Sequence, residues 1–344
     1  MVRHPNSPGT EQGKSIPQIS ILWLLLPIGL LLLTFFWKPG NSEQANKSID
    51  STQTNSASID SDNDYTYISH KKEDFRPLVY DIRESIRNTV KDELKSGMAT
   101  EISVNFELLD KGINFTYGYT DWYWPASLLK IVTLIAYLKE SETDTALLSK
   151  KIIYHRSNLG YAQNLVKDSL KEGGIYTYND LLRRLIVNSD NQACYILEKN
   201  IGSAKIDKIY SDFTIDVARG NKNLDFIPIN QYMQFLRSLY NATYLNKKNS
   251  EYALSLLINS EFVYGIRAGI PPGIKVASKF GEKADKNDLQ LHDCGIVYYD
   301  NHPYMIGVMT KGTNFEKMAQ SIQRLSNNIF QVVKNFEKGN SHSS

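Results

Sequence analysis

A serine and a lysine stand three residues apart at the start of an apolar segment. Pro125 lies two residues before Ser127, Lys130 follows, and the run 131–138 carries no charge. Proline suits the first turn of a helix, and a helix that is apolar on nearly all sides is buried. Because residues three apart share a helix face, the two side chains should lie together. Burial lowers the pKa of an ammonium, and a neutral amine can serve as base for a serine. The segment predicts Ser127 as a nucleophile and Lys130 as its base.

The Ser-x-x-Lys spacing is weak by itself, because it also occurs from Ser69 to Lys72. That second copy stands in the polar stretch Ser-His-Lys-Lys, where nothing would lower the pKa of a lysine. The apolar context, and not the pattern, therefore selects Ser127.

A second candidate is the tripeptide Ser189-Asp190-Asn191, which interrupts a helical section. A serine and an asparagine two apart in a loop can offer a hydroxyl for proton relay and an amide to hold a substrate carbonyl. The alternative is a helix N-cap. The same tripeptide also occurs at 61–63 in a polar segment, so on its own it does not decide between these interpretations.

A third candidate is Lys279-Phe280-Gly281, on an expected strand. Lys279 could bind an anionic substrate, and Gly281 would let a substrate backbone approach the strand edge. This pattern is also weak alone, since Lys-x-Gly recurs at Lys38, Lys95 and Lys171.

The elements around these residues predict an α/β body at 76–338. Apolar residues at helical spacing from Leu78 to Val90 indicate an opening helix that ends before Gly97, and a closing helix has the stripe Met318, Ile322, Leu325, Ile329 and Val332. Five segments have strand character, two before and three after a long helical section: 101–109, 115–119, 273–280, 295–299 and 304–310.

Two strands alone would be marginal, so the strands at both ends of the body should share one sheet. We therefore expect a five-stranded antiparallel sheet flanked by the N- and C-terminal helices. The parts 76–120 and 262–338 form this α/β portion, and 121–261 is an inserted all-helical domain.

Composition excludes several function classes. The net charge is +2, from 39 Lys plus Arg and 37 Asp plus Glu, so no strong field favours nucleic acid. The six histidines are scattered, and Cys194 and Cys294 lack zinc-site spacing. The two cysteines could form a disulfide, although two buried free thiols are favoured. We expect no nucleic-acid partner, no metal ion and no cofactor.

An uncharged apolar run at 16–37 predicts a membrane segment. As a helix it would be about 33 Å long, enough to span a bilayer. Its length and the absence of a small-x-small site favour an uncleaved signal anchor over a cleaved signal peptide. Arg3 and Lys14 outweigh Glu11 before the run, which places the N-terminal tail 1–15 in the cytoplasm and exports the rest.

Residues 38–75 predict a disordered tether between the membrane and the body. The stretch is rich in Ser, Asn and Asp and has few large apolar residues, so it cannot bury a core. The chain is thus expected to be a single-pass membrane protein with its body outside the cytoplasm.

The order Ser-x-x-Lys, Ser-Asp-Asn and Lys-x-Gly on a late strand resembles class A β-lactamases and penicillin-binding proteins. The likeness covers about 78–336, and the stretches 265–273 and 227–230 look like the class A branch. The resemblance implies that Ser127 is the acylated nucleophile, Lys130 its general base, and Ser189 a relay of protons to the leaving nitrogen.

The same resemblance implies four substrate-binding positions. Asn191 would hold the amide side chain of the substrate, and Lys279 would supply positive charge. The oxyanion would sit between the backbone N–H groups of Ser127 and of Glu282, the residue after Gly281.

Two departures from the family pattern bear on activity. Phe280 stands where the family usually has a Thr or Ser hydroxyl that helps to bind a substrate carboxylate. The glutamate that activates the deacylating water, followed three residues later by Leu-Asn, has no counterpart among Glu198, Glu251 and Glu261. The corresponding region carries aspartates instead: Asp207, Asp212, Asp216 and Asp225.

These features predict a membrane-anchored, exported serine hydrolase that acts on a β-lactam or related amide. One alternative is a D,D-peptidase acting on stem peptides of peptidoglycan. The other is a penicillin-binding or sensor module that is acylated and deacylates slowly, without efficient turnover.

Overall fold

A computed structural model describes residues 74–118, 123–156, 170–215, 226–285, 288–300 and 302–341. The chain divides into two units at Ser69 and His70, and the second holds all of these residues. The expected tail, the membrane segment 16–37 and all but the end of the tether lie outside the described residues. Across the described ranges, no helix combines the length and apolarity needed to cross a bilayer.

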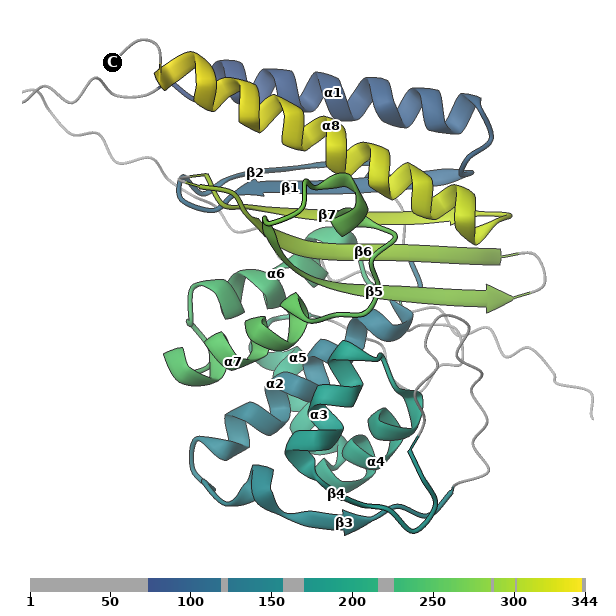
Figure 1. Ribbon diagram of the computed structural model, residues 1–344, viewed down its shortest axis with the longest axis vertical. Helices are drawn as coiled ribbons and strands as arrows, with labels where there is room; N and C mark the ends of the chain where they lie inside the picture. Colours follow the sequence, from purple (N-terminus) through teal and green to yellow (C-terminus); the bar gives the residue numbers. More distant parts are fainter. Residues whose placement is uncertain are drawn as a thin grey trace, which may run out of the picture. The chain divides into compact units, whose positions relative to one another are not determined.

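The body is built on a five-stranded antiparallel sheet in the order β2-β1-β7-β6-β5 (Figure 1). This confirms the expected sheet, in which strands from both ends of the body pair. β1 and β7 make the joint, with Val104 opposite Val308. The strands are β1 Glu101–Leu108, β2 Ile113–Tyr117, β5 Lys275–Asp285, β6 Asp288–Tyr298 and β7 Tyr304–Gly312.

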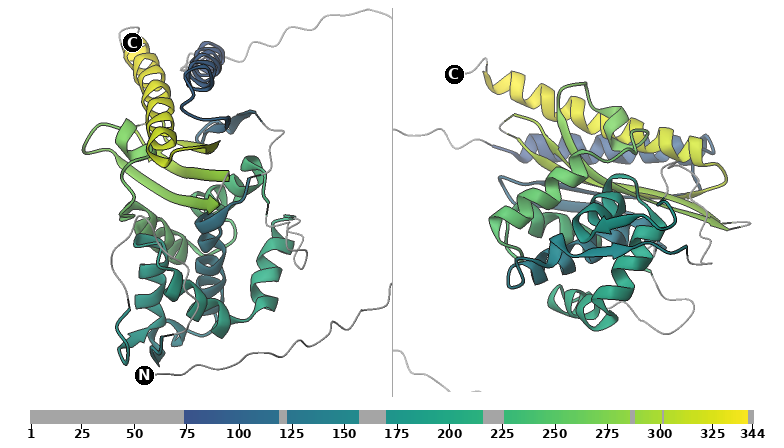
Figure 2. Two further views of the ribbon diagram at one scale, coloured as in Figure 1. Left: turned by 90° about the vertical axis from the view of Figure 1, so that its right-hand side faces the viewer. Right: turned by 60° about the horizontal axis from the view of Figure 1, so that its bottom comes forward.

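Two long helices, α1 (Arg76–Lys95) and α8 (Phe315–Ser341), pack together on one side of this sheet (Figure 2). The apolar stripe of each helix is buried against the sheet, as its spacing predicts. One position differs: Val332 is only half-buried and Val333 takes its place in the core.

The inserted part lies on the other side of the sheet (Figure 1), and α2 (Lys130–Ser141) is buried at its centre. A 3₁₀ helix, η1 (Ala126–Leu129), leads into α2. The remaining helices of the insertion are η2 Leu147–Ser149, α3 Tyr178–Val187, α4 Asn191–Ile201, α5 Ser203–Asp212, α6 Ile229–Tyr240 and α7 Lys247–Ile258. A short helix η3, Ile266–Gly269, then leads into β5.

The expectation of an all-helical insertion is wrong in one place. β3 (Lys151–Ile153) and β4 (Ile175–Thr177) form a small antiparallel sheet, with Ile152 opposite Tyr176. Each strand has only three residues, too few for a period of two to be recognised. Their partners lie more than twenty positions apart in the chain, so only the folded structure brings them together.

β6 begins seven residues before the segment 295–299 that the sequence indicates. Its first half contains Gln290, His292 and Asp293, which are polar yet buried. The sheet is covered on both faces, so polar residues on either face of β6 enter the interior. Because buried polar residues interrupt the apolar run expected of a central strand, hydrophobic periodicity does not identify the first half of β6.

Both cysteines are free thiols, which confirms the favoured expectation. Cys294 is buried in β6, whereas Cys194 on α4 is only partly buried.

A buried carboxylate joins the two long helices. Glu93 of α1 is 4% exposed and accepts hydrogen bonds from Ser321 Oγ, at 2.6 Å, and from the guanidinium of Arg324 on α8. Burial alone would raise the pKa of Glu93, but the hydrogen bonds from Arg324 and Ser321 hold it below its ordinary value. The charged form is therefore favoured in the folded state.

We expect Glu93→Gln to lower the free energy of unfolding by about 1.5–3 kcal/mol, the usual contribution of hydrogen bonds to a charged group. The matched control is Glu84→Gln, which removes an exposed pair with Arg87 on the same helix and should lower it by less than about 1 kcal/mol. Urea denaturation at pH 7 measures both. Equal losses in the two variants would contradict the structural role of Glu93.

Candidate active site

Ser127 lies in η1, immediately before α2, and is half-buried. Ala126, the residue before it, has a φ of +47°, in the left-handed region that alanine rarely adopts. Strained backbone of this kind persists only where the surrounding structure holds it, and it concentrates at functional sites. The turn that presents Ser127 is therefore held in place by its neighbours.

Two buried residues of β6 hold the chain just before this turn. Gln290 Oε1 accepts a hydrogen bond from the Trp124 N–H at 3.0 Å, and His292 Nε2 lies 3.0 Å from the Trp124 carbonyl oxygen. His292 Nδ1 accepts from the Thr310 N–H at 3.2 Å, so its Nε2 is the donor to Trp124. Burial lowers the pKa of His292 to about 4, which keeps the ring neutral and able to do both.

Gly281 of β5 allows the turn to approach the sheet. A Cβ at this position would lie 2.5 Å from the Pro125 carbonyl oxygen and 3.1 Å from the Leu128 nitrogen. The chain's own turn fills the space that a Cβ would take, and the approach of a substrate backbone to the strand edge stays a prediction. The close approach sets this part of β5 against η1, the element that carries Ser127, and the oxyanion position at Glu282 stays a prediction.

Ser189 lies in the short junction between α3 and α4 and has a φ of +50°. Asp190 caps α4, because its Oδ1 accepts from the N–H groups of Gln192, at 2.7 Å, and Ala193, at 3.1 Å. The N-cap interpretation of the tripeptide is thus correct for Asp190 alone. Ser189 and Asn191 contact the site instead.

Two lysines converge on Ser189. Lys130 Nζ donates to Ser189 O at 2.5 Å and Asn191 Oδ1 at 2.6 Å, and lies 3.2 Å from Ser189 Oγ. Lys279 Nζ of β5 donates to the same Ser189 Oγ at 2.9 Å. The structure thereby brings together four of the predicted site residues, from α2, the α3–α4 junction, α4 and β5.

Burial makes both lysines easier to deprotonate. It lowers the pKa of Lys130, which is 5% exposed, to about 8. It lowers the pKa of Lys279, which is 0% exposed, well below its ordinary value, and the neighbouring Lys130 lowers it further. Two ammonium groups that share one hydroxyl repel each other, so losing a proton from the pair is favourable. The arrangement can supply a neutral amine at pH values near 8.

Among the described residues, Ser127 Oγ has no hydrogen bond to Lys130 Nζ, so the transfer of its proton to Lys130 stays a prediction. Glu198 of α4 lies near the lysine, where it accepts from Thr133 Oγ1 at 3.1 Å. Asp212 accepts from Lys208 and from Tyr244 Oη, which ties it to the surface of the helical part. Two of the other aspartates, Asp216 and Asp225, lie outside the described residues.

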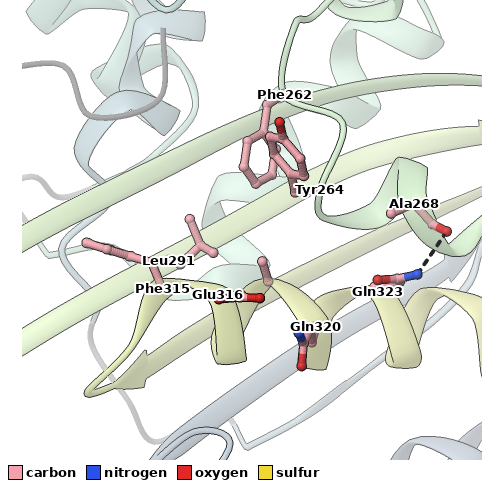
Figure 3. Close-up of a pocket in the computed structure, with 9 residues that line it drawn as sticks. Phe262, Tyr264, Ala268, Leu291, Phe315, Glu316, Gln320 and Gln323 are labelled. Carbon is pink, nitrogen blue, oxygen red and sulfur yellow. Dashed lines mark hydrogen bonds between the residues drawn. The ribbon is translucent and has the colours of Figure 1, made fainter.

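A cavity of about 480 Å³ lies on the α8 side of the sheet and has no predicted catalytic residue in its wall. Figure 3 shows Phe262 and Tyr264 close together on one side of it, with Glu316 and Gln320 of α8 on the other. The residues that line this cavity thus differ from those gathered around Ser189.

Sequence reasoning missed the residues that hold the site in position. Gln290, His292 and Asp293 were not singled out, because single polar residues in a strand carry no spacing signal. His292 becomes buried and gains its two backbone hydrogen bonds only when β6 pairs with β7 and packs against Trp124, so the sequence gives no signal of them.

If neutral Lys130 is the base for Ser127, the rate of acylation should rise with pH and level off above about 8, near the pKa of Lys130. Below that value the neutral fraction, and hence the rate, falls about tenfold for each pH unit. Labelling by a fluorophosphonate between pH 6 and 9.5 measures this. Lys130→Ala should label much more slowly and lose the dependence, and a flat profile in the unaltered protein would contradict the assignment.

Solved structures show the same fold. A beta-lactamase from Chitinophaga pinensis is 18% identical, with a TM-score of 0.64 over 72% of this chain and 99% of that one. A class A beta-lactamase from Mycobacterium abscessus is 18% identical, with a TM-score of 0.63 over 73% and 99%. A class A representative from Bacteroides cellulosilyticus is 16% identical, with a TM-score of 0.64 over 74% and 99%.

The sequence comparison agrees with this fold. No curated protein sequence matches the chain. A family model described as "Beta-lactamase enzyme family" matches residues 82–333, from the first helix to the last and well over half of the chain. Since that match includes Ser127, Ser189 and Lys279 and spans the class A fold, the chain belongs to the beta-lactamase enzyme family.

Proposed function

We propose that this protein is a serine hydrolase. A β-lactam or a related amide acylates Ser127, and water then hydrolyses the acyl-enzyme. The observation that carries the proposal is the convergence of Lys130 and Lys279 on Ser189 Oγ, at 3.2 and 2.9 Å. A buried hydroxyl between two amines is suited to pass a proton, which amide cleavage needs at the leaving nitrogen.

In this mechanism Lys130 takes the proton of Ser127, and Ser127 Oγ attacks the carbonyl carbon. The backbone N–H groups of Ser127 and Glu282 stabilise the oxyanion. When the C–N bond breaks, the hydroxyl of Ser189 gives its proton to the nitrogen and regains one from Lys130. Asn191, held by Lys130 Nζ, would position the amide side chain of the substrate. None of these steps requires a metal ion or a cofactor.

Exposure to a penicillin should add the mass of one ring-opened molecule to the protein. Ser127→Ala should remove the adduct completely, because no other residue is proposed as the nucleophile, and Ser211→Ala is a matched control on an exposed helix end that should keep it. Intact-mass spectrometry measures both over time. If folded Ser127→Ala formed the adduct in undiminished yield, Ser127 would not be the nucleophile.

The second candidate function is a penicillin-binding module that deacylates slowly, or a D,D-peptidase that prefers stem peptides. It is favoured by the lack of the family's loop glutamate in the sequence and by Asp212, which is bound to Lys208 and Tyr244. A positioned general base typically contributes about 10²- to 10⁴-fold. The same time course separates the candidates: a transient adduct indicates a hydrolase, and a lasting one indicates the binding module.

We also propose that residues 16–37 anchor the protein in the membrane as a single span, with the N-terminus in the cytoplasm and the body outside. The support is the uncharged run between Lys14 and Lys38 and the basic residues before it. Protease added to spheroplasts of an expressing bacterium should digest the body as fast as an exported control protein. Protection equal to that of a cytoplasmic control would reverse the orientation.

A further inference from the structure

An aromatic stack occupies the position next to Lys279 of β5. The ring of Phe280 lies 4.3 Å from Lys279 Nζ and stacks on the ring of Phe262, with 4.3 Å between centroids and 20° between planes. Both rings are 3% exposed. Tyr264 meets Phe262 edge-on at 6.0 Å and extends the group outward. The space beside Lys279 is thus filled by apolar rings.

The Nζ of Lys279 already contacts three groups of the protein. It donates to Ser189 Oγ at 2.9 Å and to the Phe280 carbonyl oxygen at 2.8 Å, and it lies over the Phe280 ring. Two of the three N–H donors of an ammonium are used by these oxygens, and the Phe280 ring lies against the nitrogen. Lys279 is also fully buried, so a substrate anion would have to displace an existing partner to reach it.

A carboxylate lies behind the aromatic stack. Asp293 of β6 pairs with Phe280 across the sheet and is fully buried. Its Oδ2 accepts from the Ile266 N–H at 2.8 Å. Burial raises the pKa of Asp293 to about 6, so the group is mainly ionised at pH 7.5. An anion placed at this end of the site would face a second negative charge.

Further carboxylates act on the two lysines. Asp190, Glu198 and Glu282 each raise the pKa of Lys130, against the larger effect of its burial. Glu282 and Asp293 do the same for Lys279. Four carboxyl groups therefore act on two lysines whose charged form burial disfavours, and they offset the attraction of these lysines for an anion.

Two further cations close to this strand, Arg267 and Lys283, are engaged by other groups of the described chain. The Arg267 guanidinium donates to the carbonyl oxygens of Ile258 and Val276, at 2.5 and 2.9 Å. Lys283 forms an ion pair with Asp288 at 2.7 Å. A substrate carboxylate that loses its hydration here would have to compete with these partners for Arg267 or Lys283, which is costly.

We propose that the site accepts acyl donors whose leaving-group side is uncharged or cationic, and that it excludes those with a carboxylate beside the scissile amide. This inference rests on the acyl-transfer activity proposed above and names its substrate class. Ordinary penicillins carry such a carboxylate, so they are poor substrates, and their neutral esters are better ones. The reaction is unchanged: Ser127 Oγ bonds to the carbonyl carbon, the C–N bond breaks, and Ser189 protonates the nitrogen.

The test compares acylation of the full chain by benzylpenicillin and by its methyl ester at pH 7.5. Each rate, from intact-mass spectrometry, is divided by the rate of alkaline hydrolysis of the same compound, which corrects for intrinsic reactivity. We expect the ester to acylate at least about tenfold faster than the acid.

Phe280→Thr opens the space beside Lys279 and should lower the ester-to-acid ratio at least about tenfold. Phe280→Leu is the matched control, because it also shortens the side chain but keeps the space apolar, and its ratio should stay high. Since both changes remove a core ring, Asp293→Asn provides an independent variant: it removes the negative charge, keeps an acceptor for the Ile266 N–H, and should also lower the ratio.

Faster acylation by the acid in the unaltered protein, or a ratio unchanged in both Phe280→Thr and Asp293→Asn, would overturn the inference while leaving acyl transfer intact. Acylation by neither compound would overturn the proposed function and the inference with it. A ratio that falls equally in Phe280→Leu and Phe280→Thr would show that ring size, and not chemistry, controls entry, and would also overturn it.

Discussion

The amines of Lys130 and Lys279 share one buried hydroxyl, Ser189 Oγ. The properties of the candidate site depend on this contact and on the packing that maintains it. Each ammonium loses hydration on burial, and each repels the other, so their pKa values fall. The lowered pKa values thus result from three separate parts of the fold: a central helix of the insertion, a helix junction, and an edge strand of the sheet. Loss of the packing between these parts would return both lysines to ordinary charged side chains.

The strand β6 provides the rigid support for this arrangement. Gln290 and His292 bind both backbone groups of Trp124, and the strained turn at Ala126 begins two residues later. Polar groups in a protein interior are stabilising when their hydrogen bonds are satisfied, and they then specify one geometry more narrowly than apolar packing does. Gly281 completes the support, since only a residue without Cβ lets η1 lie this close to β5.

The strand that carries Lys279 also carries Phe280, on which the expected substrate preference of this chain depends. Phe280 belongs to the core shared with α1 and α8, while Lys279 points to the helical part. A fold common to beta-lactamases therefore presents an aromatic and acidic wall at this position. Fold and catalytic residues are compatible with several substrate classes, and the side chains that surround them decide among these.

The sequence by itself determined the candidate nucleophile and base, because Ser127 and Lys130 stand in a local pattern of apolar residues that one helix explains. It also determined the five-stranded sheet, since the periodicities of strands and long helices are local properties. Tertiary structure alone decided the early start of β6, the pairing of β3 with β4, the role of Gly281, and the contact of Asp293 with the Phe280 region. Each of these depends on partners distant in the chain, and a distant partner leaves no periodic signal in the residues on either side.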